Sequence, residues 1–274
     1  MIKEDGRVTY VEIQDMLKIS SGSVNIILHQ HLNVRKRYAR WVPHSLNPEQ
    51  KQARVDWCNS MLTNFEQGRS RRVWDIVTGD ETWLYQYDPE SKQQSAVWVF
   101  PDEDPPVKFL RSKSVGKQMI ACFFSKSGHV ATVPLQDRKT VTADWYVTKC
   151  LPKVLEAWRE RRPQTGTRGL QLHHDNASAH TARATTAFLE EKNVKLVTHP
   201  PYSPDLAPND FFLFPLVKRQ LKGKKFQTPE DARRFFEAIV SDLPQSTWSG
   251  AFDNWFHRMG RCIQASGGYF EKLA

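Results

Sequence analysis

The sequence contains little cysteine, and its cysteines are not arranged as a metal site or a disulfide framework. The 274 residues include four cysteines, and no two of them form a C-x-x-C pair. A zinc ribbon or a disulfide scaffold is therefore not expected. The sequence instead predicts four reduced, mostly buried thiols in an intracellular protein, at Cys58, Cys122, Cys150 and Cys262.

Long apolar runs are lacking as well. No stretch of about 18 consecutive apolar residues is present, so the sequence predicts no membrane-spanning helix and no membrane partner. Residues 1–10 mix charges and contain no apolar core, so no secretory signal is predicted. These absences exclude the membrane and disulfide-scaffold classes of protein.

The chain is rich in aromatic residues and carries an excess of positive charge. Nine tryptophans and fifteen phenylalanines argue for a folded core, because disordered chains are poor in aromatic residues. The 39 Lys and Arg residues exceed the 30 Asp and Glu residues, which gives a net charge of +9. The length allows one or two domains. The excess charge indicates a negatively charged partner.

Residues 1–40 predict two short helices joined by a tight turn. Thr9 can cap a helix that extends to about Leu17, and Ser20 or Ser21 can cap a second one. The second helix carries apolar residues on one face, at Val24, Ile27 and Leu28. This spacing fits a helix-turn-helix and an ordinary helical hairpin equally well.

A basic run follows the two helices, at Arg35, Lys36, Arg37 and Arg40. Residues 41–68 are expected to link it to the rest of the chain, with an amphipathic helix over 47–68. The composition changes near Gly68, so residues 69–274 are predicted to form a separate domain.

From residue 71 onward the pattern alternates between strands and helices. The order β-β-β-β-α-β-α-β-α is that of a mixed α/β domain. Residues 88–117 are expected to form a long loop, and loops of such length are usually functional or disordered. The first expected strand ends at Asp80. The other expected strands cover residues 83–87, 119–124, 129–135, 170–174 and 194–197. The expected helices cover residues 144–161, 180–192, 210–221, 229–240 and 246–264.

Three aspartates stand at positions where their carboxylates can meet. Asp80 and Asp175 follow strands, and Asp210 opens a helix after a proline-rich loop. Carboxylates that converge at one sheet edge repel each other unless a cation joins them, and Mg²⁺ or Mn²⁺ prefers such oxygen ligands. Two such ions about 3.5–4 Å apart can activate water or a 3′-hydroxyl at a phosphate diester. Each aspartate taken alone is more often a cap or a turn former.

Several motifs occur in an order that resembles the mariner-type transposases of the Tc1/mariner superfamily. The acidic pair Asp175 and Asp210 is separated by 34 residues, which is the spacing of that family. The resemblance covers residues 41–274. Its motifs lie at 41–46 (WVPHSL), 78–83 (TGDETW), 174–177 (HDNA), 202–208 (YSPDLAP) and 262–271.

The resemblance implies a ribonuclease-H-like catalytic domain, a mixed sheet flanked by helices, preceded by a partial helix-turn-helix. It implies that Asp80, Asp175 and Asp210 are the catalytic and metal-binding triad, with two Mg²⁺ or Mn²⁺ ions and no small-molecule cofactor. It also implies cut-and-paste transposition: strand cleavage, then attack of a 3′-hydroxyl on double-stranded DNA, with transposon inverted repeats as the family's substrate. Residues 88–117 would be the clamp loop that reaches the partner in a homodimer, and the protein would act in the nucleus.

Residues beside the triad admit other roles. Glu81 is expected to point to the other face of its strand and to be structural. His173 and His174 have no accompanying cysteine, so zinc is not predicted, and His180 is expected to pack or to cap a helix. Asn176 can orient Asp175, touch DNA or form a turn. The prolines in residues 202–208 are expected to stiffen the approach to Asp210.

Basic clusters next to the triad favour DNA as the partner. Clusters of Lys and Arg beside a metal site are explained as phosphate contacts, which give salt-dependent affinity with little sequence preference. One cluster follows Asp210, at Lys218, Arg219, Lys222, Lys224 and Lys225, and a second lies in the long loop, at Lys108, Arg111, Lys113 and Lys117. Base readers on the second short helix would be Ser21, Ser23 and Asn25.

The chain departs from the family near its start. A full mariner protein carries two helix-turn-helix units, and this chain begins within the second, with Lys18 where the family often has glycine. The sequence therefore predicts metal-dependent DNA nicking with weak sequence direction, by a domesticated or decayed transposase. One alternative is a catalytically silent DNA-binding or scaffold protein with the same fold. Another is a structure-specific or ribonuclease-H-type hydrolase.

Overall fold

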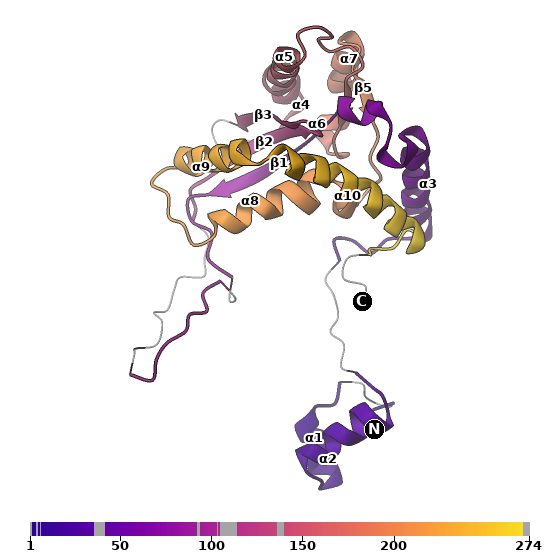
Figure 1. Cartoon of the computed structure of the whole chain (residues 1–274), viewed down its shortest axis with the longest axis vertical. Helices are drawn as coiled ribbons and strands as arrows, with labels where there is room; N and C mark the ends of the chain where they lie inside the picture. Colours follow the sequence, from indigo (N-terminus) through magenta and orange to yellow (C-terminus); the bar gives the residue numbers. More distant parts are fainter. Residues whose placement is uncertain are drawn as a thin grey trace. The chain divides into compact units, whose positions relative to one another are not determined.

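The chain forms two compact units, Met1–Val42 and Pro43–Ala274, and each is described here by itself (Figure 1). The computed structural model describes residues 2–3, 5, 7–35, 42–91, 94–102, 104, 114–135 and 140–270. Several basic residues of the sequence prediction lie outside the described residues: Lys36, Arg37, Arg40, Lys108, Arg111 and Lys113. Within the described part of the chain, every helix is too short or too polar to cross a membrane.

The smaller unit consists of two short helices and a turn. Its elements are α1 (Tyr10–Leu17), α2 (Ser21–Ile26) and the single π-turn η1 (Ile27–His31). Thr9 caps α1 and Ser20 caps α2, each by accepting a hydrogen bond from a backbone amide of the first turn. Lys18 ends α1 with φ 52° and ψ 40°, a left-handed conformation that glycine adopts more easily. A small core holds the unit together, made of Ile13, Val24 and Leu28.

The larger unit is built on a five-stranded sheet of order β3-β2-β1-β4-β5. The strands are β1 (Ile76–Tyr85), β2 (Lys117–Ser125), β3 (Gly128–Leu135), β4 (Gln171–His173) and β5 (Lys195–Val197). The first three pair antiparallel, whereas β4 and β5 run parallel to β1. The sheet is therefore mixed, as the sequence predicted.

One strand replaces the two that were expected around Asp80. Every residue from Val77 to Tyr85 pairs with β2, so the backbone continues without a break past the aspartate. The prediction that a strand ends at Asp80 was wrong, and the order is β-β-β-α-β-α-β-α. The two short periodic patterns on either side of Asp80 belong to one strand whose middle residues are polar.

Helices cover both faces of this sheet (Figure 1). Side chains alternate along β2, so Ile120, Cys122 and Phe124 join one apolar core while Ala121 and Phe123 join the other. The helices of the first core are α3 (Pro48–Asn64), α8 (Phe214–Leu221), α9 (Pro229–Asp242) and α10 (Gln245–Gln264). Those beside the second core are α4 (Ala143–Trp145), η4 (Tyr146–Cys150), α5 (Leu151–Arg161), α6 (Ser178–Thr181) and α7 (Arg183–Glu191). Short turns complete the unit: η2 (Glu66–Gly68), η3 (Arg71–Asp75), η5 (Pro204–Leu206) and η6 (Asn209–Leu213).

Two segments differ from their expected form. Residues 48–64 form α3, the helix expected over 47–68, but α3 is not a free linker, because it buries Trp57, Cys58 and Met61 in the first core. The expected helix over 180–192 is divided into α6 and α7, because Ala182 has an extended backbone with ψ 145°. All four cysteines are unpaired and buried, as predicted.

A buried arginine on α3 fastens this helix to distant parts of the chain. The Arg54 guanidinium donates two parallel hydrogen bonds to the carboxylate of Asp205, at 2.8 and 2.6 Å. It also donates to the Ser203 hydroxyl at 2.7 Å and to the Gly267 carbonyl at 2.8 Å. Both charged side chains are almost fully buried, at 0% and 3% exposure. Such a pair is tolerated in the interior only because each charge has its partners.

The Arg54→Ala substitution is expected to destabilise the larger unit by about 3–5 kcal/mol, because it leaves the Asp205 carboxylate buried without its partner. Urea denaturation of the whole chain measures this change. Arg234→Ala serves as the control, since Arg234 is 75% exposed and its contact with Asp231 is 4.0 Å long. That variant should change the stability by less than about 0.5 kcal/mol. Equal effects of the two substitutions would contradict the role given to Arg54.

Candidate active site

Strand register places Asp80 and Asp175 at the same edge of the sheet. β1 and β4 run parallel, and their last paired residues are Thr78 and His173. Asp80 and Asp175 each lie two residues beyond this pair. Because side chains repeat every two residues, both aspartates continue the same row past the end of β4.

Asp210 is brought to this edge by the residue before it. Asn209 is 1% exposed, and its side-chain amide donates a hydrogen bond of 2.9 Å to the Cys122 carbonyl on β2. Cys122 is the residue that pairs with Asp80 in the β1–β2 ladder. The turn η6, which carries Asp210, is therefore fastened to the sheet beside Asp80.

The three carboxylates influence one another's protonation. Burial raises the pKa of Asp80 well above its usual value, and the neighbouring charges of Asp210, Glu81 and Asp175 raise it further. Burial and the charge of Asp175 raise the pKa of Asp210 to about 6, although Lys218 acts in the opposite direction. These carboxylates repel one another, and a divalent cation would relieve that repulsion.

A histidine joins two of the acidic residues. His180 Nδ1 lies 2.7 Å from Asp175 Oδ1, and its Nε2 lies 3.3 Å from Glu81 Oε1. Burial alone would lower the pKa of His180, but the two carboxylates raise it to about 10. Burial alone would raise the pKa of Asp175, but the hydrogen bonds from His180 and from the Ala177 amide lower it. His180 is thus a cation that holds two carboxylates.

Two residues have more contacts with the site than the sequence indicated. We call Asp80, Asp175 and Asp210 the acidic cluster. Glu81 was expected to be structural and to face away, but it reaches this cluster through His180 and by its charge on Asp80. His180 does pack, as expected, with its ring 4.5 Å from that of Tyr146. The sequence did not predict the bonds of His180 to the two carboxylates. Glu81 is 99 positions away from His180, and Asp175, although five positions away, lies in the turn before the helix of His180.

Asn176 shapes the turn that follows Asp175. Its side-chain amide donates a hydrogen bond of 2.7 Å to the His199 carbonyl. His199 in turn bonds His173 through ring nitrogens 3.0 Å apart, and His173 meets the Thr78 hydroxyl at 2.9 Å. Of the three roles considered for Asn176, this contact supports orientation of the Asp175 turn.

Cavities open on both sides of Asp210. A cavity of about 820 Å³ is lined by Glu81 and Asp210 together with the basic residues Lys218, Arg219 and Lys222. A second cavity, of about 580 Å³, is lined by Asp175, Asn176, His199, Tyr202 and Asp210, among others. We call them the basic cavity and the proline-loop cavity, because residues 200–204 of the second include Pro200, Pro201 and Pro204. A substrate that reaches the carboxylates therefore has room on either side.

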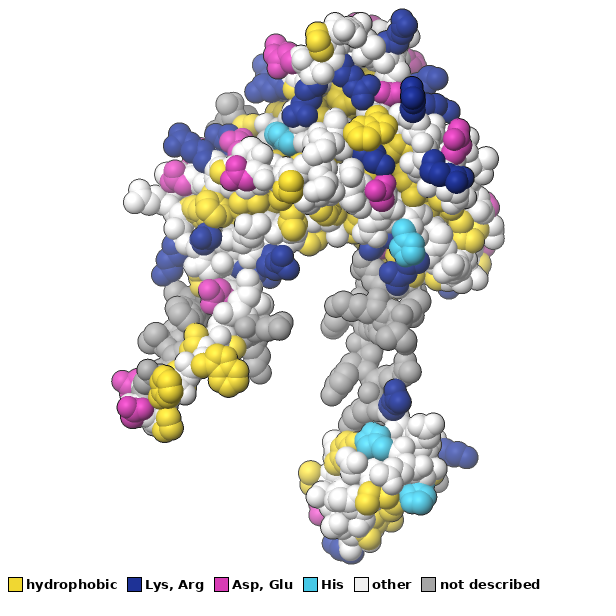
Figure 2. Space-filling view, in the orientation of Figure 1, with side chains coloured by type: hydrophobic (Ala, Val, Ile, Leu, Met, Phe, Trp, Pro, Cys, Tyr) yellow, Lys and Arg dark blue, Asp and Glu magenta, His cyan; other side chains and the backbone are white. Residues whose placement is uncertain are grey.

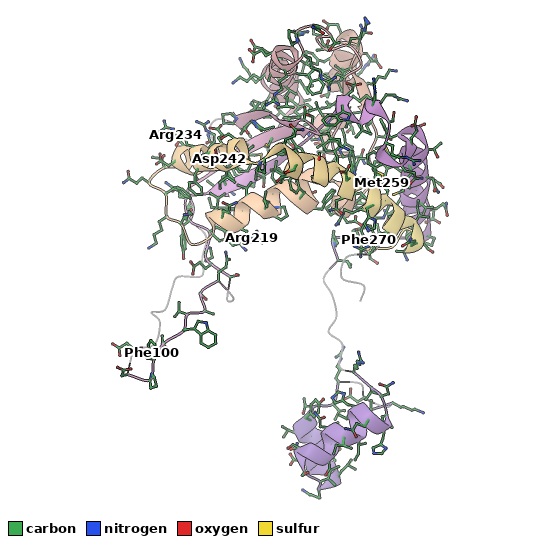
Figure 3. All side chains as sticks on the ribbon, in the orientation of Figure 1. Phe100, Arg219, Arg234, Asp242, Met259 and Phe270 are labelled. Atoms are coloured by element: carbon green, nitrogen blue, oxygen red, sulfur yellow. The ribbon has the colours of Figure 1, made fainter. Side chains whose placement is uncertain are left out.

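The predicted DNA-binding residues fall into separate groups. Lys218, Arg219 and Lys222 lie on or just after α8 beside Asp210, and Figure 3 labels Arg219 there. Figure 2 shows Lys and Arg side chains spread over the visible face of the larger unit, so it is the shared cavity with Asp210 that distinguishes these three. Lys117 opens β2, with its ammonium 4.2 Å from the centre of the Trp83 ring. The smaller unit contains Ser21, Ser23, Asn25 and Arg35, all exposed.

The acidic residues fit a divalent cation by their chemistry. Aspartate oxygens are the ligands that Mg²⁺ and Mn²⁺ prefer, and the carboxylates of Asp80, Asp175 and Asp210 repel one another. Among the described residues, however, no three His, Cys, Asp or Glu side chains are already grouped closely enough to hold a metal ion. Asp175 is instead turned toward His180.

Comparison with known proteins identifies the family. Residues 75–233 match the DDE superfamily endonucleases, and the chain belongs to this family. It is 29% identical over 274 residues to the mariner Mos1 transposase of Drosophila mauritiana, covering 99% of this chain and 77% of that protein. It is 30% identical over 275 residues to the human histone-lysine N-methyltransferase SETMAR, covering 99% of this chain but 39% of that protein. The predicted resemblance to mariner transposases is thus confirmed.

The structure of a pre-cleavage Mos1 transpososome gives the same result for the fold. The two chains share a TM-score of 0.83 and 28% identity, over 98% of this chain and 78% of the Mos1 chain. The predicted ribonuclease-H-like fold, a mixed sheet flanked by helices, is confirmed.

Mg²⁺ or Mn²⁺ is expected to raise the melting temperature of the protein, because a cation that binds the folded chain relieves the repulsion among the carboxylates. A metal concentration 100 times its dissociation constant stabilises the folded chain by about 2.7 kcal/mol. Differential scanning calorimetry with and without metal measures the shift. Asp210→Asn should lose most of it. Asp253→Asn is the control, since Asp253 is 64% exposed and pairs with Lys126. A shift of the same size in both variants would contradict the site.

Proposed function

We propose that this chain is a metal-dependent DNA endonuclease that acts as a mariner-type transposase. The observation that supports the proposal is the electrostatic coupling of three aspartates: in addition to burial, the charges of Asp210 and Asp175 raise the pKa of Asp80, and the charge of Asp175 raises that of Asp210. The basic cavity beside Asp210 supports a polyanionic substrate. All three acidic positions of the mariner triad are aspartate in this chain.

The three aspartates would hold two Mg²⁺ or Mn²⁺ ions. Bound metal would activate a water molecule or a 3′-hydroxyl and stabilise the leaving oxygen at a DNA phosphate. Mos1 paired-end complexes have been solved with Mn and with Mg, which supports this choice of ions. Water would hydrolyse a phosphodiester to leave a 3′-hydroxyl and a 5′-phosphate. The 3′-hydroxyl would then attack a phosphodiester of the target DNA, form a new P–O bond and displace the 3′-oxygen of the target strand as its leaving group.

Other residues of the chain position the substrate and the triad. His180 restrains Asp175 and Glu81, and Asn209 fixes the turn that carries Asp210. Lys218 and Arg219 would bind DNA phosphates near the cut, because their cationic groups line a cavity with Asp210. Lys222, at the same cavity, and Lys117, beside Trp83, would extend this contact.

The smaller unit would read DNA. Residues 1–40 would form a partial helix-turn-helix, joined through 41–68 to the catalytic domain at 69–274. Exposed polar side chains on α2 would face base edges, and the basic run after the helices would contact phosphates. These residues are Ser21, Ser23 and Asn25, with Arg35, Lys36 and Arg37. Double-stranded DNA with transposon-end sequences is the proposed substrate, and the nucleus is the proposed location.

A homodimer is the proposed assembly, with residues 88–117 as the clamp loop. This segment presents consecutive apolar residues to solvent: Val97, Trp98, Val99 and Phe100 are 60%, 103%, 47% and 72% exposed (Figure 3 labels Phe100). Such a patch indicates a surface that another chain covers. The paired-end complexes of Mos1 support two protomers that act together.

The Asp210→Ala variant is expected to nick supercoiled plasmid DNA at least about 100-fold more slowly than the parent in Mg²⁺ or Mn²⁺, since loss of a metal-orienting group alone costs 10–100-fold. Gel electrophoresis of the nicked circle measures the rate, and Asp253→Asn is the control. If Asp210→Ala nicked at the parental rate, the proposed function would be wrong.

The same assay separates the two alternatives. A catalytically silent scaffold would shift labelled DNA in gels and cleave nothing with any metal. A ribonuclease-H-type hydrolase would prefer a hybrid or flapped substrate over plain duplex. Labelled duplex, flap and hybrid substrates, with Mn²⁺ and with a chelator, complete the comparison.

Removal of the three cations Lys218, Arg219 and Lys222 together should weaken DNA binding equally for all sequences. It should lower the slope of log affinity against log salt by about 3, since each phosphate contact contributes about 0.9. Fluorescence anisotropy over a salt series measures the slope. The matched control replaces three exposed cations beside the other core, Lys149, Lys153 and Arg159. An unchanged slope in the first triple variant would contradict the phosphate contacts.

A further inference from the structure

Tyr202, in the loop between β5 and η5, has an unusual backbone and an exposed ring. Its φ is +52°, a left-handed conformation that large side chains adopt rarely. The residue is 53% exposed. Strained residues persist only where their surroundings hold them, and they cluster at functional sites.

Neighbouring residues fix the Tyr202 ring and backbone. The ring stacks on that of His44, with centroids 3.9 Å apart and planes inclined by 17°. The Tyr269 hydroxyl donates a hydrogen bond of 2.7 Å to the Tyr202 carbonyl, and the Arg54 guanidinium lies 5.0 Å from the centre of the Tyr269 ring. The buried Arg54–Asp205 pair thus supports the residue that holds Tyr202.

The fixed ring lies at the acidic cluster. Tyr202 lines the proline-loop cavity together with Asp175 and Asp210. The volume of this cavity, about 580 Å³, is within the range of sites that enclose a small ligand. Because prolines flank Tyr202 in this cavity, the loop has little freedom to move the ring away. A nucleotide whose phosphate lay at Asp175 and Asp210 in this cavity would share the cavity with Tyr202.

We propose that the Tyr202 ring, backed by His44, is a stacking platform for one unpaired nucleobase of the DNA strand that enters the acidic cluster. The inference rests on the proposed function and assigns a nucleobase subsite to it. One face of the ring is covered by His44, and the exposure of Tyr202 leaves surface for a second flat partner. Stacking reads the face of a base and not its edge, so the platform accepts any base.

The test is a binding cycle between the ring and the base. The DNA is a duplex with a single-stranded 3′ extension, in which one abasic residue is moved along the extension and into the duplex. Binding is measured by anisotropy with Ca²⁺ in place of Mg²⁺, so that affinity is separated from cutting. The parent chain is compared with Tyr202→Asn, because Asn tolerates a left-handed backbone but has no ring.

At one abasic position, the parent should lose about 10-fold in affinity, and Tyr202→Asn should lose the same on intact DNA. The two changes together should lose no more than either alone, because they remove one contact. Tyr202→Phe keeps the ring and should recover the binding. Trp74→Ala removes an exposed aromatic residue outside the cavity and is the control.

The platform would be overturned if the affinity losses from the abasic residue and from Tyr202→Asn multiplied when combined. It would also be overturned if the Tyr202→Asn chain bound like the parent at every abasic position. A fluorescent 2-aminopurine at the sensitive position supplies a second readout on the parent chain, which needs no variant to fold. Its emission should change on binding, and an unchanged emission at all positions would also overturn the platform. A parent chain that cuts DNA through Asp210 while Tyr202 has no effect would leave the proposed function standing and remove the platform alone.

Discussion

The buried pair of Arg54 and Asp205 is the contact on which the arrangement of the site depends. It joins α3 to the loop that precedes Asp210, and the two charged residues are 151 positions apart in the sequence. Further bonds fix the same loop, from Arg258 Nε to the Asp205 carbonyl at 2.6 Å and from Trp255 Nε1 to the Leu206 carbonyl at 2.7 Å. The third carboxylate is therefore placed by α3 and α10, whereas the first two are placed by the sheet.

Because separate elements place the carboxylates, the acidic cluster stays together although its carboxylates repel one another. Two carboxylates follow from strand register, and the third follows from a loop that two helices fasten down. Carboxylates with raised pKa values oppose one another in the folded chain, and only a rigid frame keeps them together. Packing of α3 into the core of the larger unit is part of that frame, which gives the segment before the sheet a role in the site.

The sequence predicted the parts of the fold and site that depend on local pattern. Alternation located β2 and β3, and capping residues located both short helices. The assignment of Asp80, Asp175 and Asp210 as a metal-binding triad stays a prediction. Contacts between residues far apart in the chain could not be predicted from the sequence. Arg54 is a charged residue in an amphipathic helix, and nothing local distinguishes its complete burial from ordinary exposure. His180 and Glu81 meet only because the chain returns past the sheet edge, and β1 was divided in two because its central polar residues interrupt the apolar alternation.

The uneven pairing of β1 has a mechanical consequence. In the described part of the chain, β4 pairs with β1 only from Ile76 to Thr78, whereas β2 pairs with it as far as Tyr85. The N-terminal part of β1 thus pairs with strands on both sides, and its C-terminal part pairs with β2 alone. Asp80 lies just past this change, so among the described strands its backbone has a neighbour in β2 and none on the side of β4. The side of β1 that faces away from β2 is thus free of ladder hydrogen bonds to β4 from Gly79 onward, at the point where Asp175 follows β4.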